Sequence, residues 1–208
     1  MATIALQAPT RLSLETAGAL MTPEEFDAVE EYDENYMYEL INGVLVVHAI
    51  PLAEETDPND ELGHLLRAYR VGHSKGACLD ATMPQQHVRL KKSRRIADRL
   101  LWIGLGRLPK VRRDVATIAV EFVSAGKRSR QRDYIHKKRE YMAVGVKEYW
   151  IIDRFQRTLT VVTKSAGKVV EKIIPESRNY RSPLLPGFEL PLAQLLAMAD
   201  RWAEQNES

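Results

Sequence analysis

Two short apolar segments each carry one acidic side chain, and this feature constrains the fold more than any other. Residues 95–103 contain Asp98, and residues 115–123 contain Glu121. Apolar runs of this length are typical of buried strands. A carboxylate in such a strand is unfavourable unless it is paired, hydrogen-bonded or bound to metal. Because a lysine-rich segment follows, the pattern predicts a divalent-ion site that acts on phosphate.

Composition places the chain among ordinary globular proteins. With 208 residues and a net charge of +2, it can form one substantial core, and any affinity for nucleic acid must come from clustered positive charge. We expect a loosely ordered lead-in over residues 1–21 and a single domain over residues 22–208. The single cysteine, Cys78, cannot form an internal disulfide. The absence of a signal peptide and of long apolar runs predicts a cytoplasmic protein that does not span a membrane.

Periodicity and turn residues predict an α/β fold, a mixed β-sheet flanked by helices. The strongest local signal is Asn42 followed by Gly43, which predicts a tight hairpin turn. The expected helices are residues 23–32, residues 62–72 after a capping loop at 55–60, residues 131–144 closed by Gly145, and a terminal helix from 192. The expected strands are residues 36–41, 44–50, 78–83, 87–90, the Asp98 and Glu121 segments, 148–153, 158–164 and 168–174.

The Glu121 strand predicts where the chemistry lies. Side chains alternate along a strand, so Glu121 shares a face with Ala119 and Val123, near the carboxyl end where ligands of open α/β sheets bind. If Asp98 lies on a neighbouring strand, the two carboxylates converge. A Mg²⁺-like ion bound by them and by water would hold a phosphodiester and activate the attacking water.

The following helix supplies candidate cations. Asp133, Lys137 and Tyr141 recur every four residues and face the same way, so Lys137 is the candidate for orienting a water or stabilising negative charge. Lys138 points elsewhere on the helix and is a candidate contact for backbone phosphate. Further basic residues upstream predict an electrostatic approach for nucleic acid; they are Lys127, Arg128, Arg130 and Arg132.

Each of these residues also has a purely structural interpretation. Asp98 could pair with a nearby arginine, namely Arg94, Arg95 or Arg99. Glu121 could form a buried ion pair with Lys137, and a lysine within a run of charges is often only solvated. The sequence lacks the loop motifs of α/β-hydrolases, nucleoside triphosphatases and dinucleotide-binding proteins, so these classes have no support.

Several motifs together resemble one known family. They are Tyr38 to Gly43, Ala97 with Asp98, Val120 to Ser124, the Asp133, Lys137 and Tyr141 set, Gly145 to Asp153, and Ser182 to Glu189. In this order they resemble the Uma-two family of restriction-endonuclease-like proteins, within the PD-(D/E)XK nuclease superfamily. The resemblance covers roughly residues 22–200 and implies a restriction-endonuclease-like fold.

The resemblance implies a role for each matching residue. Asp98 matches the aspartate of the PD element, although Ala97 replaces its proline, and Glu121 matches the second acid. The main-chain carbonyl of Phe122 would complete the metal shell. Val123 stands where the superfamily has its lysine, and the family's habit of moving that lysine to the next helix points to Lys137.

A further acid and the activity also follow from the resemblance. Glu39 matches a recurrent family acid that would add a water or second-metal contact, or it could simply pair across the hairpin. The implied activity is a Mg²⁺- or Mn²⁺-dependent endonuclease that hydrolyses phosphodiester bonds of DNA, with a homodimer as a plausible assembly. The alternative is a catalytically inactive nucleic-acid-binding or interaction protein that retains the nuclease fold.

Overall fold

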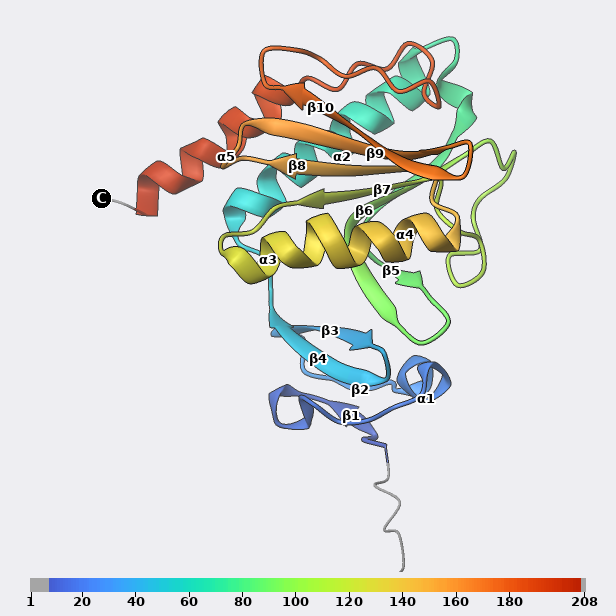
Figure 1. Ribbon diagram of the computed structural model, residues 1–208, viewed down its shortest axis with the longest axis vertical. Coiled ribbons are helices and arrows are strands. Elements are labelled where there is room, and N and C mark those ends of the chain that lie inside the picture. Colours follow the sequence, from blue (N-terminus) through green and yellow to red (C-terminus); the bar gives the residue numbers. More distant parts are fainter. Residues whose placement is uncertain (1–7, 207–208) are drawn as a thin grey trace, which may run out of the picture. The chain divides into compact units, whose positions relative to one another are not determined.

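The structure, a computed structural model, describes residues 8–206 and divides into two compact units (Figure 1). The first unit comprises Met1–Pro51 and His87–Ile96, and the second comprises Leu52–Gln86 and Ala97–Ser208. Two strands, β5 (Leu79–Arg89) and β6 (Arg94–Ile103), have residues in both units. The expected single domain over residues 22–208 stays a prediction, and residues 1–7 of the expected lead-in lie outside the described residues.

None of the helices in residues 8–206 is both long and apolar enough to cross a lipid bilayer.

The first unit contains the predicted hairpin. Strands β3 (Tyr36–Ile41) and β4 (Val44–Ala49) pair in antiparallel fashion, and φ is +51° at Asn42 and +84° at Gly43. Two consecutive positive φ angles are those of a type I′ turn, which explains the Asn-Gly sequence. The pairing gives the unit a small core of Leu12, Met21, Phe26, Tyr38, Leu40 and Leu45.

The first helix is shorter than predicted. Helix α1 (Pro23–Ala28) begins with the expected capping box, in which Thr22 and Glu25 each accept a hydrogen bond from the other's backbone. It ends at Ala28 because Val29 has extended backbone angles. The chain then forms β2 (Glu31–Tyr32), which pairs in parallel with β1 (Arg11–Leu12), so the expectation of a helix to residue 32 is wrong.

The second unit holds five strands in the order β10-β9-β8-β7-β6, and β5 also pairs with β6. Only β7 and β8 are parallel neighbours in this order. The remaining strands of the second unit are β7 (Ile118–Phe122), β8 (Glu148–Asp153), β9 (Thr158–Ser165) and β10 (Lys168–Pro175). Its α-helices are α2 (Ala53–Gly72), α3 (Lys127–Gln131), α4 (Lys138–Val144) and α5 (Leu192–Asn206). The predicted mixed sheet flanked by helices is thereby confirmed.

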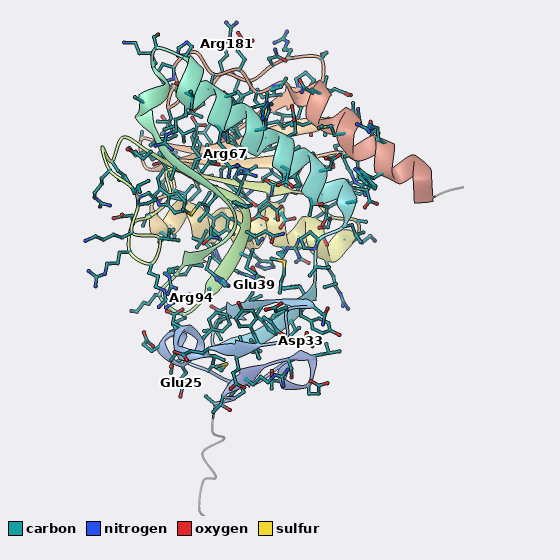
Figure 2. All side chains as sticks on the ribbon, turned by 180° about the vertical axis from the view of Figure 1, so that it is seen from behind. Glu25, Asp33, Glu39, Arg67, Arg94 and Arg181 are labelled. Atoms are coloured by element: carbon teal, nitrogen blue, oxygen red, sulfur yellow. The ribbon has the colours of Figure 1, made fainter. Side chains whose placement is uncertain are left out.

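Helices cover both faces of this sheet. Helices α2 and α5 pack on one face, which the reverse view shows in front, and α3 and α4 pass across the other (Figures 1 and 2). Val120 and Phe122 of β7 join Leu62 and Leu195 in the main core beneath α2 and α5. Because side chains alternate, Glu121 between them points to the face that α3 and α4 cover.

Two predicted boundaries in the second unit are wrong. Residues 55–60, expected as a capping loop, belong to α2, which begins at Ala53 and includes Pro58. Acidic residues in its first turn favour the helix start, and the proline removes only one backbone donor near that end. The strands expected at 78–83 and 87–90 form one strand, β5, that continues through a positive φ of 48° at Gln85.

Candidate active site

The pairing of β6 with β7 brings the two predicted acids together. The register joins Arg99 to Val120 and Leu100 to Ala119. Continued by one residue, it sets Asp98 opposite Glu121, and opposite residues of antiparallel strands project to the same face. The convergence expected from the sequence therefore arises from the register of two neighbouring strands.

Asp98 is held by backbone rather than by a cation. Its Oδ2 accepts a hydrogen bond of 2.6 Å from the N–H of Phe122, and Oδ1 accepts none from any described residue. The side chain is only partly buried. Asp98 therefore presents one free oxygen on a side chain that solvent reaches.

The arginines near Asp98 bind elsewhere, so the alternative of a pairing with one of them is wrong for the described residues. The guanidinium groups of Arg94 and Arg95 pair with acids of the first unit, at 2.8 and 3.4 Å respectively. Arg99 points to the opposite face of β6 and donates to Asn59. Asp98 thus remains available for a ligand.

Glu121 is buried, with 2% of its surface exposed, and both of its oxygens are hydrogen-bonded. The Nζ of Lys137 lies 2.8 Å from Oε2, and the hydroxyl of Tyr141 donates to Oε1 at 3.0 Å. The predicted ion pair between Glu121 and Lys137 is present. A carboxylate can accept about four hydrogen bonds or metal contacts, so each oxygen retains a further lone pair.

The helical segment that supplies Lys137 contains an unusual turn. It begins at Lys127 rather than at residue 131 as predicted, and a π-helical stretch, η3 (Arg132–Lys137), joins α3 to α4. Asp133, Lys137 and Tyr141 are all buried, as their spacing predicts. The segment ends at Gly145, whose φ of +107° confirms the predicted left-handed cap. Wide turns of this kind often occur at functional sites.

Burial and neighbouring charge raise the proton affinity of both acids. Burial raises the pKa of Asp98 to about 6, against the opposing influence of Lys137. Burial also raises the pKa of Glu121 well above its usual range; Lys137 opposes this, and the charges of Asp98 and Asp133 reinforce it. A cation placed between the two carboxylates would relieve this repulsion.

The donor set fits a hard divalent cation that keeps much of its water. Among the side chains that the structure describes, those of residues 8–202, no cluster of three or more His, Cys, Asp or Glu is arranged for metal binding. An ion here would depend on two carboxylates, a main-chain carbonyl and water. Magnesium is commonly bound by one or two carboxylates while it keeps several waters. Asp98 and Glu121 therefore fit such an ion, and Phe122 as the third protein ligand stays a prediction.

Comparisons with known proteins show the family and the fold of the chain. The sequence profile of a family described as "Putative restriction endonuclease", Uma2, matches residues 23–193. The chain belongs to the Uma2 family. A solved structure described as "a putative nuclease belonging to DUF820", from Anabaena variabilis ATCC 29413, matches with a TM-score of 0.64 and 13% identity.

That structural match covers 86% of this chain and 99% of the other. At this identity the likeness shows the fold alone, and it confirms the predicted restriction-endonuclease-like fold. A comparison with curated protein sequences gave no significant match. Family and fold together point to a nuclease, and the resemblance to Uma2 seen in the sequence is confirmed.

Glu39, the further acid that the Uma2 resemblance implies, lies in β3 of the first unit (Figure 2). It is buried, and Oε1 accepts the backbone N–H of Ile96 at 2.7 Å. Its Oε2 lies 3.1 Å from Nε2 of His48 on β4 and 3.4 Å from a guanidinium nitrogen of Arg95. The cross-hairpin pairing is therefore present, and a catalytic role for Glu39 stays a prediction.

The predicted nucleic-acid contacts of this Uma2 protein differ in their availability. Lys127 and Arg128 are exposed and form no ion pair within the described residues. Arg130 pairs at 3.2 Å with the buried Asp153, and Lys138 pairs at 2.7 Å with Glu171. The first two cations are free to meet phosphate, whereas the other two are already paired with acids of this chain.

One contact of the site was not anticipated from the sequence. Asn59 of α2 donates from Nδ2 to the main-chain carbonyl of Asp98 at 2.8 Å. The sequence does contain a signal for this contact. Asn59 lies three residues before Leu62 and seven before Leu66, which places it on the apolar stripe of α2. An amide on a buried stripe requires polar partners, and here they belong to Asp98 and Arg99.

Proposed function

We propose that this Uma2 protein is a Mg²⁺-dependent endonuclease that hydrolyses phosphodiester bonds of DNA. The observation that carries the proposal is the set of Asp98, Glu121 and Lys137 on one face of the sheet, with Lys137 2.8 Å from Glu121. Two carboxylates beside a lysine have the chemistry needed to bind a cation and a phosphate together. Membership of a nuclease family and the nuclease-like fold support it.

In this proposal Asp98 and Glu121 hold the ion, with the carbonyl of Phe122 as a further ligand. When bound, Mg²⁺ or Mn²⁺ would supply a Lewis acid for the phosphate and lower the pKa of a coordinated water. Asp98 offers its free Oδ1, and Glu121 offers the lone pairs that Lys137 and Tyr141 leave. A supporting role for Glu39, which lies in the first unit, stays a prediction.

Lys137 can orient the attacking water or stabilise the developing negative charge, because it has several hydrogen-bond donors. Its ammonium has three N–H donors, and one of them is directed to Glu121. A second can orient the attacking water or bind a phosphate oxygen as negative charge develops. The water adds to phosphorus and gives up a proton, the bond from phosphorus to the leaving oxygen breaks, and that oxygen takes up a proton, so that one water is consumed. The products are two shorter strands, one ending in phosphate and one in hydroxyl.

Exposed cations would bring the substrate to this site. Lys127 and Arg128 begin the helical segment that carries Lys137, and both lack ion-pair partners among the described residues. They are suited to contact the phosphate backbone without reading the bases. A homodimer would allow a cut in both strands, and a cytoplasmic location would give access to DNA. Both stay predictions of this proposal.

A second candidate is a nucleic-acid-binding or interaction protein that keeps the fold without catalysis. The observation that favours it is that Lys137 and Tyr141 already satisfy both oxygens of Glu121. Val123, which stands where the superfamily has its lysine, also favours a protein without catalysis. In this case DNA binding would persist without any need for metal.

A cleavage assay separates the two. Single-stranded, double-stranded and branched DNA, and RNA, are incubated with the protein and Mg²⁺ or Mn²⁺, alongside Asp98→Ala and Glu121→Ala. The proposal expects metal-dependent cleavage of a DNA substrate that falls at least 100-fold in each variant. Arg181→Ala, which changes an exposed residue paired with Glu189, is the matched control and should retain activity. No cleavage of any substrate, with DNA binding intact, supports the second candidate.

A further inference from the structure

The main-chain carbonyl of Asp98 depends on a side chain from α2. The paired register of β6 with β7 ends at Arg99 and Val120. Two residues beyond Val120, the N–H of Phe122 donates to the carboxylate of Asp98. At this point the Asp98 carbonyl accepts from Nδ2 of Asn59 at 2.8 Å. A side-chain amide of α2 thus holds the backbone of the residue whose acid projects toward Glu121.

Arg99 fixes the orientation of that amide. Its Nε donates to Oδ1 of Asn59 at 2.8 Å, and one terminal nitrogen donates to the Asn59 main-chain carbonyl at 2.7 Å. The other terminal nitrogen donates to the hydroxyl of Thr82 at 3.2 Å. With its oxygen bound to Arg99, Asn59 must direct its NH₂ group to Asp98.

Gly63 of α2 gives the Arg99 guanidinium the room for this arrangement. A Cβ at Gly63 would lie 2.6 to 2.7 Å from three atoms of the Arg99 guanidinium. A side chain at this position would force the guanidinium to shift, because the guanidinium lies directly against the helix backbone. Arg99 is 2% exposed as a result.

The asparagine at position 59 indicates that the contact with the Asp98 carbonyl, and not only the contact with Arg99, determines the residue type. Arg99 is a buried cation whose nearest described acid, Asp60, lies 4.0 Å away and is 79% exposed at its side chain. An aspartate at 59 would serve Arg99 better, because it would compensate the charge. It would have no donor for the Asp98 carbonyl, however. Among residues of this size and shape, only asparagine both accepts from Arg99 and donates to Asp98.

We propose that Asn59 is a positioning residue for the nuclease site, which fixes the backbone of Asp98 and so aims its carboxylate at Glu121 and at the incoming ion. Arg99 acts one step further back by orienting the Asn59 amide. The inference rests on the proposed function, because it assigns Asp98 to the ion. The acid and its support lie on opposite faces of β6, since Asp98 and Arg99 are consecutive in the strand.

The test uses Asn59→Asp, which keeps the acceptor for Arg99 and loses the donor for Asp98. The first measurement needs no metal: amide hydrogen exchange at Phe122, whose N–H is bonded to the Asp98 carboxylate. We expect exchange to become at least tenfold faster in Asn59→Asp while the overall stability is kept. Thr82→Val, which removes another contact of Arg99 but none of Asp98, is the matched control and should leave exchange unchanged.

A second variant keeps the inference testable if Asn59→Asp does not fold. Asn59→Leu with Arg99→Met removes the whole polar cluster and replaces it with apolar groups of similar shape, a change that buried polar groups often tolerate. It should also accelerate Phe122 exchange at least tenfold. Folded Asn59→Asp and Asn59→Leu/Arg99→Met variants that both exchange at Phe122 as the wild type does would overturn the inference.

Mn²⁺ binding supplies the functional measurement. If the wild type binds Mn²⁺ at Asp98, Asn59→Asp should weaken that binding about tenfold and Thr82→Val should not. Unchanged affinity in Asn59→Asp would also overturn the inference. If the wild type binds no Mn²⁺, the proposed function fails, and Phe122 exchange still decides whether Asn59 positions Asp98.

Discussion

Nζ of Lys137 lies 2.8 Å from Oε2 of Glu121, and neither side chain is more than 5% exposed. The pair joins the middle of the sheet to the helical segment that crosses it. Because each charge is buried, each needs the other to remain ionised. The same two groups are those that the proposed mechanism assigns to the ion and to the water.

Removal of the lysine should destabilise the protein strongly. Lys137→Met leaves Glu121 buried without its cation, and we expect the free energy of unfolding at pH 8 to fall by about 3 kcal/mol. Urea denaturation measures it. Addition of Glu121→Gln to this variant should restore much of the loss. Lys138→Met, which breaks the exposed pair with Glu171, is the control and should change stability by less than about 0.5 kcal/mol. Equal losses in the two lysine variants would argue against a buried pair.

Asp98 should make the metal-free protein less stable as the pH rises. Its folded pKa, about 6, is above the ordinary value of 3.8, so the folded state holds this proton more tightly than the unfolded chain. The resulting stabilisation is complete below pH 4 and is lost as the pH rises through 6. Asp98→Asn lacks this titration.

Asp98→Asn therefore isolates the contribution of Asp98 to the pH dependence of stability. Relative to the wild type, Asp98→Asn should gain about 2 kcal/mol of stability between pH 4 and pH 8. Chemical denaturation at the two pH values gives the difference directly. A stability difference between the two proteins that does not change with pH would show that the pKa of Asp98 is ordinary.

Tyr141 should matter through its hydroxyl. Tyr141→Phe removes the donor to Oε1 of Glu121 and should lower the free energy of unfolding by about 2 kcal/mol at pH 8, because the acceptor is charged and buried. It should also raise the pH at which Mn²⁺ binds, since Glu121 will hold its proton more tightly. Tyr32→Phe, at an exposed tyrosine, is the control. Calorimetric titration from pH 5 to 8 measures the shift, and an unshifted midpoint would contradict this role.

The four predicted phosphate contacts should separate into two classes. Lys127→Ala with Arg128→Ala should weaken DNA binding and reduce the slope of log affinity against log salt by about 2, without loss of stability. Arg130→Ala should mainly destabilise the protein, because it leaves the buried Asp153 without its cation. Fluorescence anisotropy over a salt series, with thermal melts, distinguishes the classes. An unchanged salt slope in the double variant would exclude those two residues from the DNA interface.

Local sequence signals predicted most of the strands, because the turns and caps that bound the strands depend on one or two residues each. The turn at Asn42 and Gly43 has the positive φ angles that its residues favour, and the left-handed cap at Gly145 likewise depends on one residue. The convergence of Asp98 with Glu121 could be expected only if their strands were neighbours. The β6 to β7 pairing supplied that condition.

The errors arise where tertiary contacts outweigh local signals. Residues 55–60 have loop-like composition, yet they are helical in α2, where Asn59 reaches both Asp98 and Arg99. The π-helical turn that precedes α4 has no clear sequence signature. The partners of Arg130 and Lys138, Asp153 and Glu171, come from later strands, so a contiguous basic run could not reveal them.

Mn²⁺ binding to the purified protein at pH 8 tests the central claim most directly. Isothermal titration should show a site in the wild type that is lost in Asp98→Asn and in Glu121→Gln. Glu189→Gln, at an exposed acid paired with Arg181, should bind as the wild type does. A wild type that binds no Mn²⁺, or an Asp98→Asn variant that binds it equally well, would contradict the assignment of these two acids to a metal site.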